Sequence, residues 1–314
     1  MRKKWFLLIF LFFGYLLLFP QTALLSAQDG LLLWYRQVLP ILFPFLFLNT
    51  LAMRTIHASD LPGLLIRPLM RAFHCSAYGA FVILSGFLCG FPMGAFLTGD
   101  LYRNEKISRD EARLLFGFVN NLSPGFIISY LSAGQMKMPR SAGWFLVQIL
   151  GAALLCGWLD ARTQSRVSSF SVGIESESEP DLKAGSGNIF SLIDDCIYAA
   201  MSNALRLGAY IMLFAILSGA VQKIFPVTCP AALLLVSGIE VTSGVRLIAE
   251  SGLSASAKYV AVSALGAFGS LSALVQSAGI ARMDKEMLFY YIKSRAKITL
   301  LAILISSAAL LVRF

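Results

Sequence analysis

The sequence predicts an all-α polytopic membrane protein built from two inverted repeats, each with a broken, re-entrant helical hairpin and a facing unwound helix. Three observations predict it: a very apolar composition, long apolar segments between basic loops, and similar breaks in the two halves. Of the 314 residues, 57% are hydrophobic and 14% are charged, and the mean hydropathy is +0.74. Because a soluble domain carries about 25% charged residues, most of this chain is expected to lie in a lipid bilayer.

The net charge of +9 does not indicate a nucleic-acid partner. Lys and Arg occur in short clusters between apolar stretches, without the continuous basic face that nucleic-acid binding requires. The five cysteines contain no C-x-x-C pair and there are only two histidines, so no familiar metal-binding spacing can be assembled. We therefore expect no metal site and no cofactor, apart from a coupling proton or sodium ion.

The first apolar run, from Trp5 to Ala27, follows a basic start and ends in small residues, which is compatible with a cleaved signal peptide. It is also long enough to cross a hydrocarbon core, which takes about 20 residues. We favour a retained transmembrane helix within residues 1–30. Further apolar stretches follow at about 31–53, 77–101, 112–133, 142–159, 196–222, 230–249, 257–281 and 297–313.

Two of these stretches, 77–101 and 230–249, are interrupted near the middle by LSGFLCGFPMGAF and VSGIEVTSGV. Irregular backbone at membrane depth is tolerated only inside the protein or along a cavity, so we predict two re-entrant hairpins. With a cytoplasmic amino terminus, this path places most basic residues on the inner side, from Arg103 to Arg113 and including Arg295. That distribution is what the positive-inside rule requires.

A polar stretch at 161–190, rich in Ser and acidic residues, divides the chain into a first repeat at 31–160 and a second at 191–314. We interpret this stretch as a solvated cytoplasmic linker. The two halves share an order of motifs: SGFLCGFPMG at 85–94 with SGIEVTSGVR at 237–246, and LFGFVNNLSPGFIISYLSAG at 115–134 with ALGAFGSLSALVQSAG at 264–279. Inverted repeats with matching breaks are typical of secondary transporters. Small residues that only let helices pack closely are the structural alternative.

The breaks supply the candidate binding residues. GFPMGA at 90–95 is expected to leave amides near Met93 and Gly94 without intrahelical partners, and such amides attract anions. In NNLSPG, Pro124 frees a carbonyl one turn earlier; the alternative there is a proline kink satisfied by neighbouring helices. The full candidate set is Gly90, Phe91, Pro92, Met93, Gly94, Asn120, Asn121, Ser123, Pro124, Glu240, Thr242, Ser243, Gly244 and Arg246.

Glu240 is the one carboxylate deep within a predicted membrane segment. A charge there costs about 2.5–3.5 kcal/mol even on insertion scales, so such a residue is a functional candidate by default. We expect it to carry a proton or to coordinate a cation with Thr242 and Ser243; the alternative is a neutral acid at a helix contact. Arg246 either meets an anionic substrate or pairs with Glu250 one turn on.

Several motifs together resemble the YlbJ-type sporulation integral membrane proteins, within the wider group that carries the nucleoside-recognition Gate domain. They are VLPILFPFLF at 38–47, RPLMR at 67–71, GFPMGA at 90–95, ISRDEARLL at 107–115, NNLSPGFI at 120–127 and IEVTSG at 239–244. The resemblance implies a multi-pass protein of the bacterial cell membrane, in the mother cell or the forespore, that transports dipicolinate during spore formation. Comparison with the group's concentrative nucleoside transporters implies a hairpin tip at Gly90 to Gly94, a facing unwound segment at Asn120 to Ser123, and Glu240 to Gly244 in the second half's site.

The sequence therefore predicts a secondary transporter of a small anionic metabolite, with dipicolinate as the first candidate. The alternatives are a non-transporting membrane scaffold for sporulation and a nucleoside-type transporter. An enzyme is not expected, because no H-E-x-x-H and no G-x-S-x-G motif occurs. The expected partners are the lipid bilayer and the small-molecule substrate, with a homo-oligomer left open.

Overall fold

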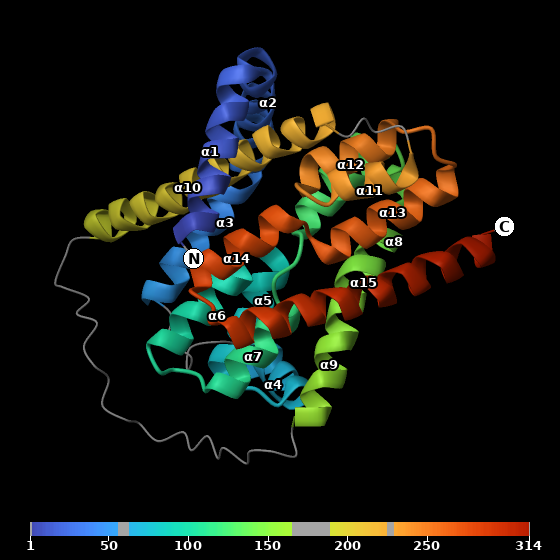
Figure 1. Cartoon of the computed structure of the whole chain (residues 1–314). Helices are drawn as coiled ribbons and strands as arrows, with labels where there is room; N and C mark the ends of the chain where they lie inside the picture. The colour runs from blue at the N-terminus through green and yellow to red at the C-terminus, as the bar shows by residue number, and fades with distance from the viewer. Residues whose placement is uncertain (1, 56–62, 165–188, 225–228, 314) are drawn as a thin grey trace.

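The computed structural model describes residues 2–55, 63–164, 189–224 and 229–313, and every regular element in these ranges is a helix (Figure 1). Four described helices are long and apolar enough to cross a bilayer, and two bent helix pairs each qualify as one broken span. The prediction of an all-α polytopic membrane protein is confirmed. The linker predicted at 161–190 falls largely outside the described residues, which stop at Gln164 and resume at Ile189.

A layer of long helices is formed by the amino-terminal elements and by α10 (Figure 1). Its elements are α1 (Arg2–Leu18), α2 (Pro20–Leu33), the π-helix η1 (Trp34–Val38), α3 (Leu39–Thr55) and α10 (Ile189–Ile224). Small residues let α10 approach closely, because a Cβ on Gly208 would lie only 2.6 Å from the Trp34 ring. The indole Nε1 of Trp34 donates to the carbonyl of Ala204 at 3.0 Å and fixes η1 against α10.

The amino-terminal segment corrects the expectation of one straight helix from Trp5 to Ala27. The chain breaks at Phe19, and the helices on either side of it are bent by 103°. Pro20 occupies the first turn of α2, where its fixed φ and missing amide are tolerated. Apolar length alone therefore identified the segment but not its bend.

The first half of the chain contains a helical hairpin at the position predicted for it. Its elements are α4 (Gly63–Phe73), α5 (Ala77–Cys89), α6 (Met93–Arg103), α7 (Arg109–Phe118), the π-helix η3 (Phe126–Gln135), η4 (Pro139–Ser141), α8 (Ala142–Leu146), η5 (Val147–Gly151) and α9 (Ala152–Gln164). At about 1.5 Å per residue, α5 and α6 are each shorter than a hydrocarbon core of about 30 Å. Gly86 and Gly94 let them pack closely, since a Cβ on Gly86 would lie 3.2 Å from the Gly94 Cα.

Both open ends of this hairpin lie at one end of the molecule. Ser76, which precedes α5, donates its backbone amide to the Glu111 carboxylate at 2.7 Å, and Glu111 follows α6 after a short turn. Ser108 caps α7 by accepting from the Glu111 amide at 3.2 Å, so the Ser-x-x-Glu pattern forms its first half only. The carboxylate of Glu111 instead accepts from Ser76 at the start of the earlier helix α5, and this bond holds the base of the hairpin together.

The second half of the chain, after α10, has a similar order of breaks. Its elements are α11 (Pro230–Ser237), α12 (Val241–Glu250), α13 (Ala255–Phe268), α14 (Leu271–Ala281) and α15 (Lys285–Arg313). Figure 1 shows α11 and α12 toward the top of the view, with α5 and α6 toward the bottom. The stretch 257–281, expected to be one segment, is interrupted at Gly269, whose φ is +97°, and at Ser270.

Helix α15 corrects both the predicted start of the last segment and the placement of Arg295. The helix begins at Lys285, although the apolar stretch begins at 297. Arg295, expected in a cytoplasmic loop, is 0% exposed within the helix. Lys297 pairs with Asp160 of α9 at 2.9 Å. The basic residues lower the mean hydropathy of this stretch, but the helix continues through them.

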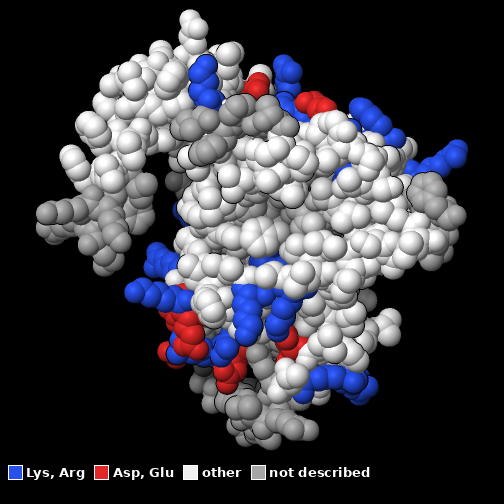
Figure 2. Space-filling view, turned by 45° about the vertical axis from the view of Figure 1, so that its right-hand side comes forward, with Lys and Arg blue, Asp and Glu red and all other residues white. Residues whose placement is uncertain are grey.

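The surface reverses the pattern of a soluble protein. Large apolar side chains stand exposed, for example Phe10 at 64% and Leu304 at 66%, as expected of side chains that face lipid. Figure 2 shows charged side chains collected mainly toward the two ends of the visible face, with a mostly uncharged band between them. The buried polar residues include Asn120, Gln148, Glu240, Ser277 and Arg295. Of these, Asn120 and Glu240 lie at breaks between helices.

Candidate functional site

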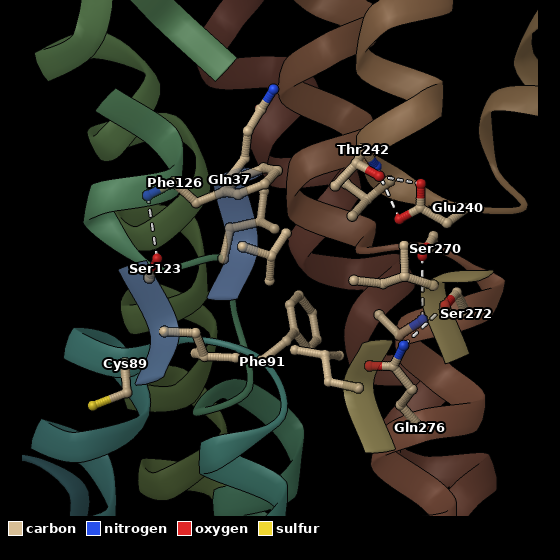
Figure 3. Close-up of a pocket in the computed structure, with 17 residues that line it drawn as sticks. Gln37, Cys89, Phe91, Ser123, Phe126, Glu240, Thr242, Ser270, Ser272 and Gln276 are labelled. Carbon is tan, nitrogen blue, oxygen red and sulfur yellow. Dashed lines mark hydrogen bonds between the residues drawn. The ribbon is translucent and has the colours of Figure 1, made fainter. Parts of the chain in front are cut away.

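A pocket lies where the chain breaks of the two halves of the chain meet the long helices (Figure 3). Its empty space, with its open mouth included, is about 640 Å³. The lining residues come from η1, α3 and α10 on one side and from the chain breaks and the helices next to them on the other: Gln37, Val38, Leu42, Cys89, Phe91, Leu122, Ser123, Phe126, Leu207, Ile211, Glu240, Val241, Thr242, Ser270, Ser272, Ala273 and Gln276. The lining is mostly apolar with a few polar groups, as in many ligand sites.

The tip of the first hairpin is held by the unwound segment between α7 and η3. The amide of Phe91 donates to the Asn121 carbonyl at 2.7 Å. Gly90 has φ +76°, and a Cβ there would lie 2.5 Å from the Ser123 nitrogen. Glycine is therefore required both by the left-handed backbone and by the close approach.

The amides of this tip are not available to a ligand in the way the sequence suggested. The Met93 amide donates to the Gly90 carbonyl at 2.9 Å, and the Ala95 amide donates to Asn120 Oδ1 at 3.3 Å. The acceptors of these two amides lie outside α6, in the turn and in the unwound segment, so both amides are already bonded within the protein. An anion site made by the start of α6 alone is not supported by these contacts.

Glu240 caps helix α12 from the tip of the second hairpin, and it also lines the pocket. Its carboxylate accepts from the Thr242 amide at 3.1 Å and from the Ser243 amide at 2.8 Å. The hydroxyls of both residues also donate to it, that of Ser243 at 3.0 Å. At 2% exposure, the carboxylate occupies the amides that α12 would otherwise offer to an anion.

The second unwound segment bonds the second tip. Backbone amides of Leu271 and Ser272 donate to the carbonyls of Gly238 and Ile239 at 2.8 and 3.0 Å. The second break also meets the first hairpin, because a Cβ on Gly269 would lie 2.9 Å from the Phe91 Cζ. Figure 3 shows Phe91 between Ser123 on one side and the Ser270, Ser272 and Gln276 group on the other.

Asn120 and Asn121 form a buried polar network behind the pocket. The Asn120 amide group donates to the Ser277 hydroxyl at 2.5 Å and to the Tyr291 hydroxyl at 2.9 Å. Arg295 donates from Nη1 to the Asn120 carbonyl at 2.9 Å and to the Ala267 carbonyl at 3.2 Å. Its Nη2 donates to Asn121 Oδ1 at 3.0 Å. One guanidinium therefore bonds the first unwound segment and the last turn of α13, directly before the second break.

The predicted site residues differ in where they lie relative to the pocket. Those that line the pocket are Phe91, Ser123, Glu240 and Thr242. Those that position the breaks or their neighbouring backbone without lining it are Gly90, Gly94, Asn120, Asn121, Ser243 and Gly244; Pro124 directly follows the first break, and Pro92 and Met93 line a smaller hollow beside Phe96.

Arg246 lies outside the pocket. Its guanidinium is 3.7 Å from the Asp29 carboxylate of α2, and its side chain is 46% exposed. It stands more than one helical turn beyond the start of α12, so it does not join the groups at the break. Arg246 is not among the residues that line the pocket, and its partner is Asp29 instead of the expected Glu250.

Sequence reasoning missed three contributions to the site. Gln37 reaches the pocket from the π-helix η1, and π-helical turns often occur at functional sites. Ser270 and Gln276 come from the second unwound segment and from α14. The correspondence of 264–279 with the NNLSPG region was the one sequence signal that pointed to them. Arg295 carried no such signal.

Comparisons with known proteins agree with this architecture. No family model and no solved structure matches the chain. The chain is similar to the sporulation integral membrane protein YlbJ of Bacillus subtilis (strain 168), with 28% identity over 291 residues, covering 83% of this chain and 71% of that protein. The multi-pass helical structure and this similarity along most of the chain support the resemblance to the YlbJ-type sporulation integral membrane proteins.

Proposed function

We propose that the protein is a secondary transporter whose small metabolite binds in the pocket between the two unwound segments. The observation that carries the proposal is the meeting of both repeats' chain breaks at one pocket, lined by Phe91 and Ser123 from the first repeat and by Glu240 and Ser270 from the second. Irregular backbone inside a membrane protein is tolerated where it lines a cavity, and broken helices of two repeats form the substrate sites of many transporters. An inverted orientation of the repeats is part of this proposal.

The proposed cargo is a small carboxylate, first of all dipicolinate, carried together with a proton. Glu240 is the charged residue among the described pocket lining, so an anion and an ionised Glu240 repel each other. Protonation of Glu240 removes that repulsion, and by linkage the anion favours the protonated form. Arg295 bonds Asn121 and Ala267, and both of these lie within three residues of residues that line the pocket. It therefore adds a positive charge behind the pocket.

A neutral polar solute such as a nucleoside is the second candidate. One observation favours it: the described lining includes amide and hydroxyl groups from Gln37, Ser272 and Gln276, and neither Lys nor Arg. Such groups match a neutral molecule with several hydrogen-bonding edges. The relative's name refers to sporulation, and we propose the same setting for this chain.

The test is uptake of labelled dipicolinate and labelled nucleoside into vesicles that contain the purified protein, with and without an imposed pH gradient. Glu240→Gln keeps the shape of the side chain and removes its ionisation, so we expect proton-driven uptake to be abolished. Glu250→Gln, on the exposed side of the same helix, is the matched control and should transport normally. Normal pH-driven uptake by Glu240→Gln would exclude the coupling role. If neither solute moves and substitutions in the 165–185 region abolish sporulation instead, the scaffold alternative is favoured.

A further inference from the structure

We propose that Arg295 is a positioning residue that holds the two unwound segments, and with them the two polar sides of the pocket, in one arrangement. The guanidinium is 0% exposed and donates to three acceptors: two carbonyls at 2.9 and 3.2 Å and one side-chain amide oxygen at 3.0 Å. These acceptors belong to Asn120, Ala267 and Asn121, so they lie on both sides of the contact between repeats. This role concerns the same pocket as the proposed function, but it does not depend on transport.

The charge of Arg295 is unusual because the ion pairs among the described residues do not include it. A buried charge without a counter-charge is costly, and it persists here because neutral oxygens surround it. Its Nε has no hydrogen-bond partner. Neither a surface ion pair nor helix propensity alone would account for an arginine that is buried at this cost.

The contacts that lead from Arg295 to the pocket are short. In the first repeat, Asn121 accepts from Arg295 through its side chain and from Phe91 through its carbonyl, and Phe91 lines the pocket. In the second repeat, Ala267 precedes Gly269, which contacts the Phe91 ring, and Ser270, which lines the pocket. A shift of Arg295 therefore reaches both sides through bonded or touching groups.

The planar fork of guanidinium suits this position better than an ammonium. Nη1 and Nη2 point to acceptors on different segments, and a lysine provides one nitrogen at the end of a flexible chain. Arg295→Lys keeps the charge and loses the fork, whereas Arg295→Gln loses both. If the fork is what matters, the two variants behave alike.

Cys89 offers a native reporter of the first tip. It lines the pocket, directly precedes Gly90 and is 4% exposed. Cys196 on α10 is 0% exposed and serves as an internal reference in the same molecule. We would treat the purified full-length protein in lipid nanodiscs with a maleimide and follow the modification of each cysteine by mass spectrometry.

We expect Arg295→Lys and Arg295→Gln each to raise the rate of Cys89 modification at least tenfold relative to Cys196. Lys293→Gln, an exposed charge on the same helix, is the matched control and should leave the ratio unchanged. A parental ratio in Arg295→Lys would overturn the proposal, and so would an equal rise at Cys196, because it would mean general loosening. Absence of solute uptake would refute the transporter and leave this measurement standing.

Asn121 variants decide the question if the Arg295 variants do not fold. Asn121→Ala removes the acceptor of Arg295 Nη2 and should raise Cys89 modification several-fold. Asn121→Asp loses, as Asn121→Ala does, the donation from Nδ2 to the Phe118 carbonyl at 2.7 Å, but it keeps an acceptor for the guanidinium and should stay nearer the parental rate. If the two variants are modified at the same rate, Arg295 does not position the first tip.

Discussion

Gly90→Ala should destabilise the protein more than any ordinary glycine-to-alanine change in a helix. Gly90 has φ +76°, a left-handed conformation that costs other residues roughly 1–2 kcal/mol. The new Cβ would lie 2.5 Å from the Ser123 nitrogen and 2.9 Å from the Ser123 Cα. Both atoms belong to the backbone, so the hairpin tip has to move away from the unwound segment.

That movement breaks the hydrogen bond from the Phe91 amide to the Asn121 carbonyl, which measures 2.7 Å. Leaving a buried backbone group unsatisfied costs roughly 1–3 kcal/mol. The two contributions together predict a loss of about 2–5 kcal/mol in the free energy of unfolding. Gly269→Ala also places an alanine at a positive φ, +97°, but it should cost less, because its Cβ would meet the Phe91 ring at 2.9 Å and the ring can tilt.

Gly143→Ala is the matched control, since nothing lies within 4 Å of a Cβ at that helical position. Alanine there should stabilise the helix by up to about 1 kcal/mol. Thermal unfolding of the three variants in the same detergent should therefore rank the midpoints in the order Gly143→Ala, Gly269→Ala, Gly90→Ala. A Gly90→Ala midpoint equal to that of Gly143→Ala would refute the close contact between tip and unwound segment.

Two further predictions concern the base of the first hairpin. Burial raises the pKa of the Glu111 carboxyl, and hydrogen bonds from Ser76 offset the shift only in part. The folded state therefore binds this proton more tightly, and stability falls as pH rises from the ordinary pKa to the raised one. Glu111→Gln keeps an acceptor for Ser76 and should flatten that part of the profile of thermal midpoint against pH, which begins at about pH 4; an unchanged slope contradicts it. Single cysteines at Asn104 and Lys137 test topology: an impermeant reagent on intact cells should label position 137 and not position 104, and labelling at 104 would mean that α5 and α6 together cross the membrane.

The hairpin breaks could be predicted because their signals are local. Glycine and proline inside an apolar run mark a break wherever they occur, and the GFP sequence at Gly90 and Pro92 lies between α5 and α6. Glu240 was equally visible, since a carboxylate in an apolar segment stands out in any reading of composition. The bend at Phe19 was not, because Pro20 lies in a stretch whose length already accounted for a span.

The break at Gly269 shows the limit of local signals. Its sequence, AFGSLS, has a glycine and two serines and lacks a proline, a pattern that occurs in many unbroken membrane helices. What opens the helix is tertiary: the amides of Leu271 and Ser272 find carbonyl acceptors at Gly238 and Ile239 of the second tip. A window that covers one helix cannot see acceptors that are about thirty residues away.

Arg295 and the unwound segments each look costly in isolation, and together they remove much of that cost. A break in a buried helix leaves carbonyls such as those of Asn120 and Ala267 without intrahelical donors, and a buried guanidinium requires several acceptors at once. In this structure each supplies what the other lacks, at 2.9 and 3.2 Å. A hydropathy reading counts the arginine as a loop residue because it assumes unbroken helices around it. The same pairing explains why one residue on α15 contacts two segments that are about 150 residues apart in the chain. The carbonyls next to both breaks lie within hydrogen-bond distance of one guanidinium, whose planar fork can donate to several acceptors at once.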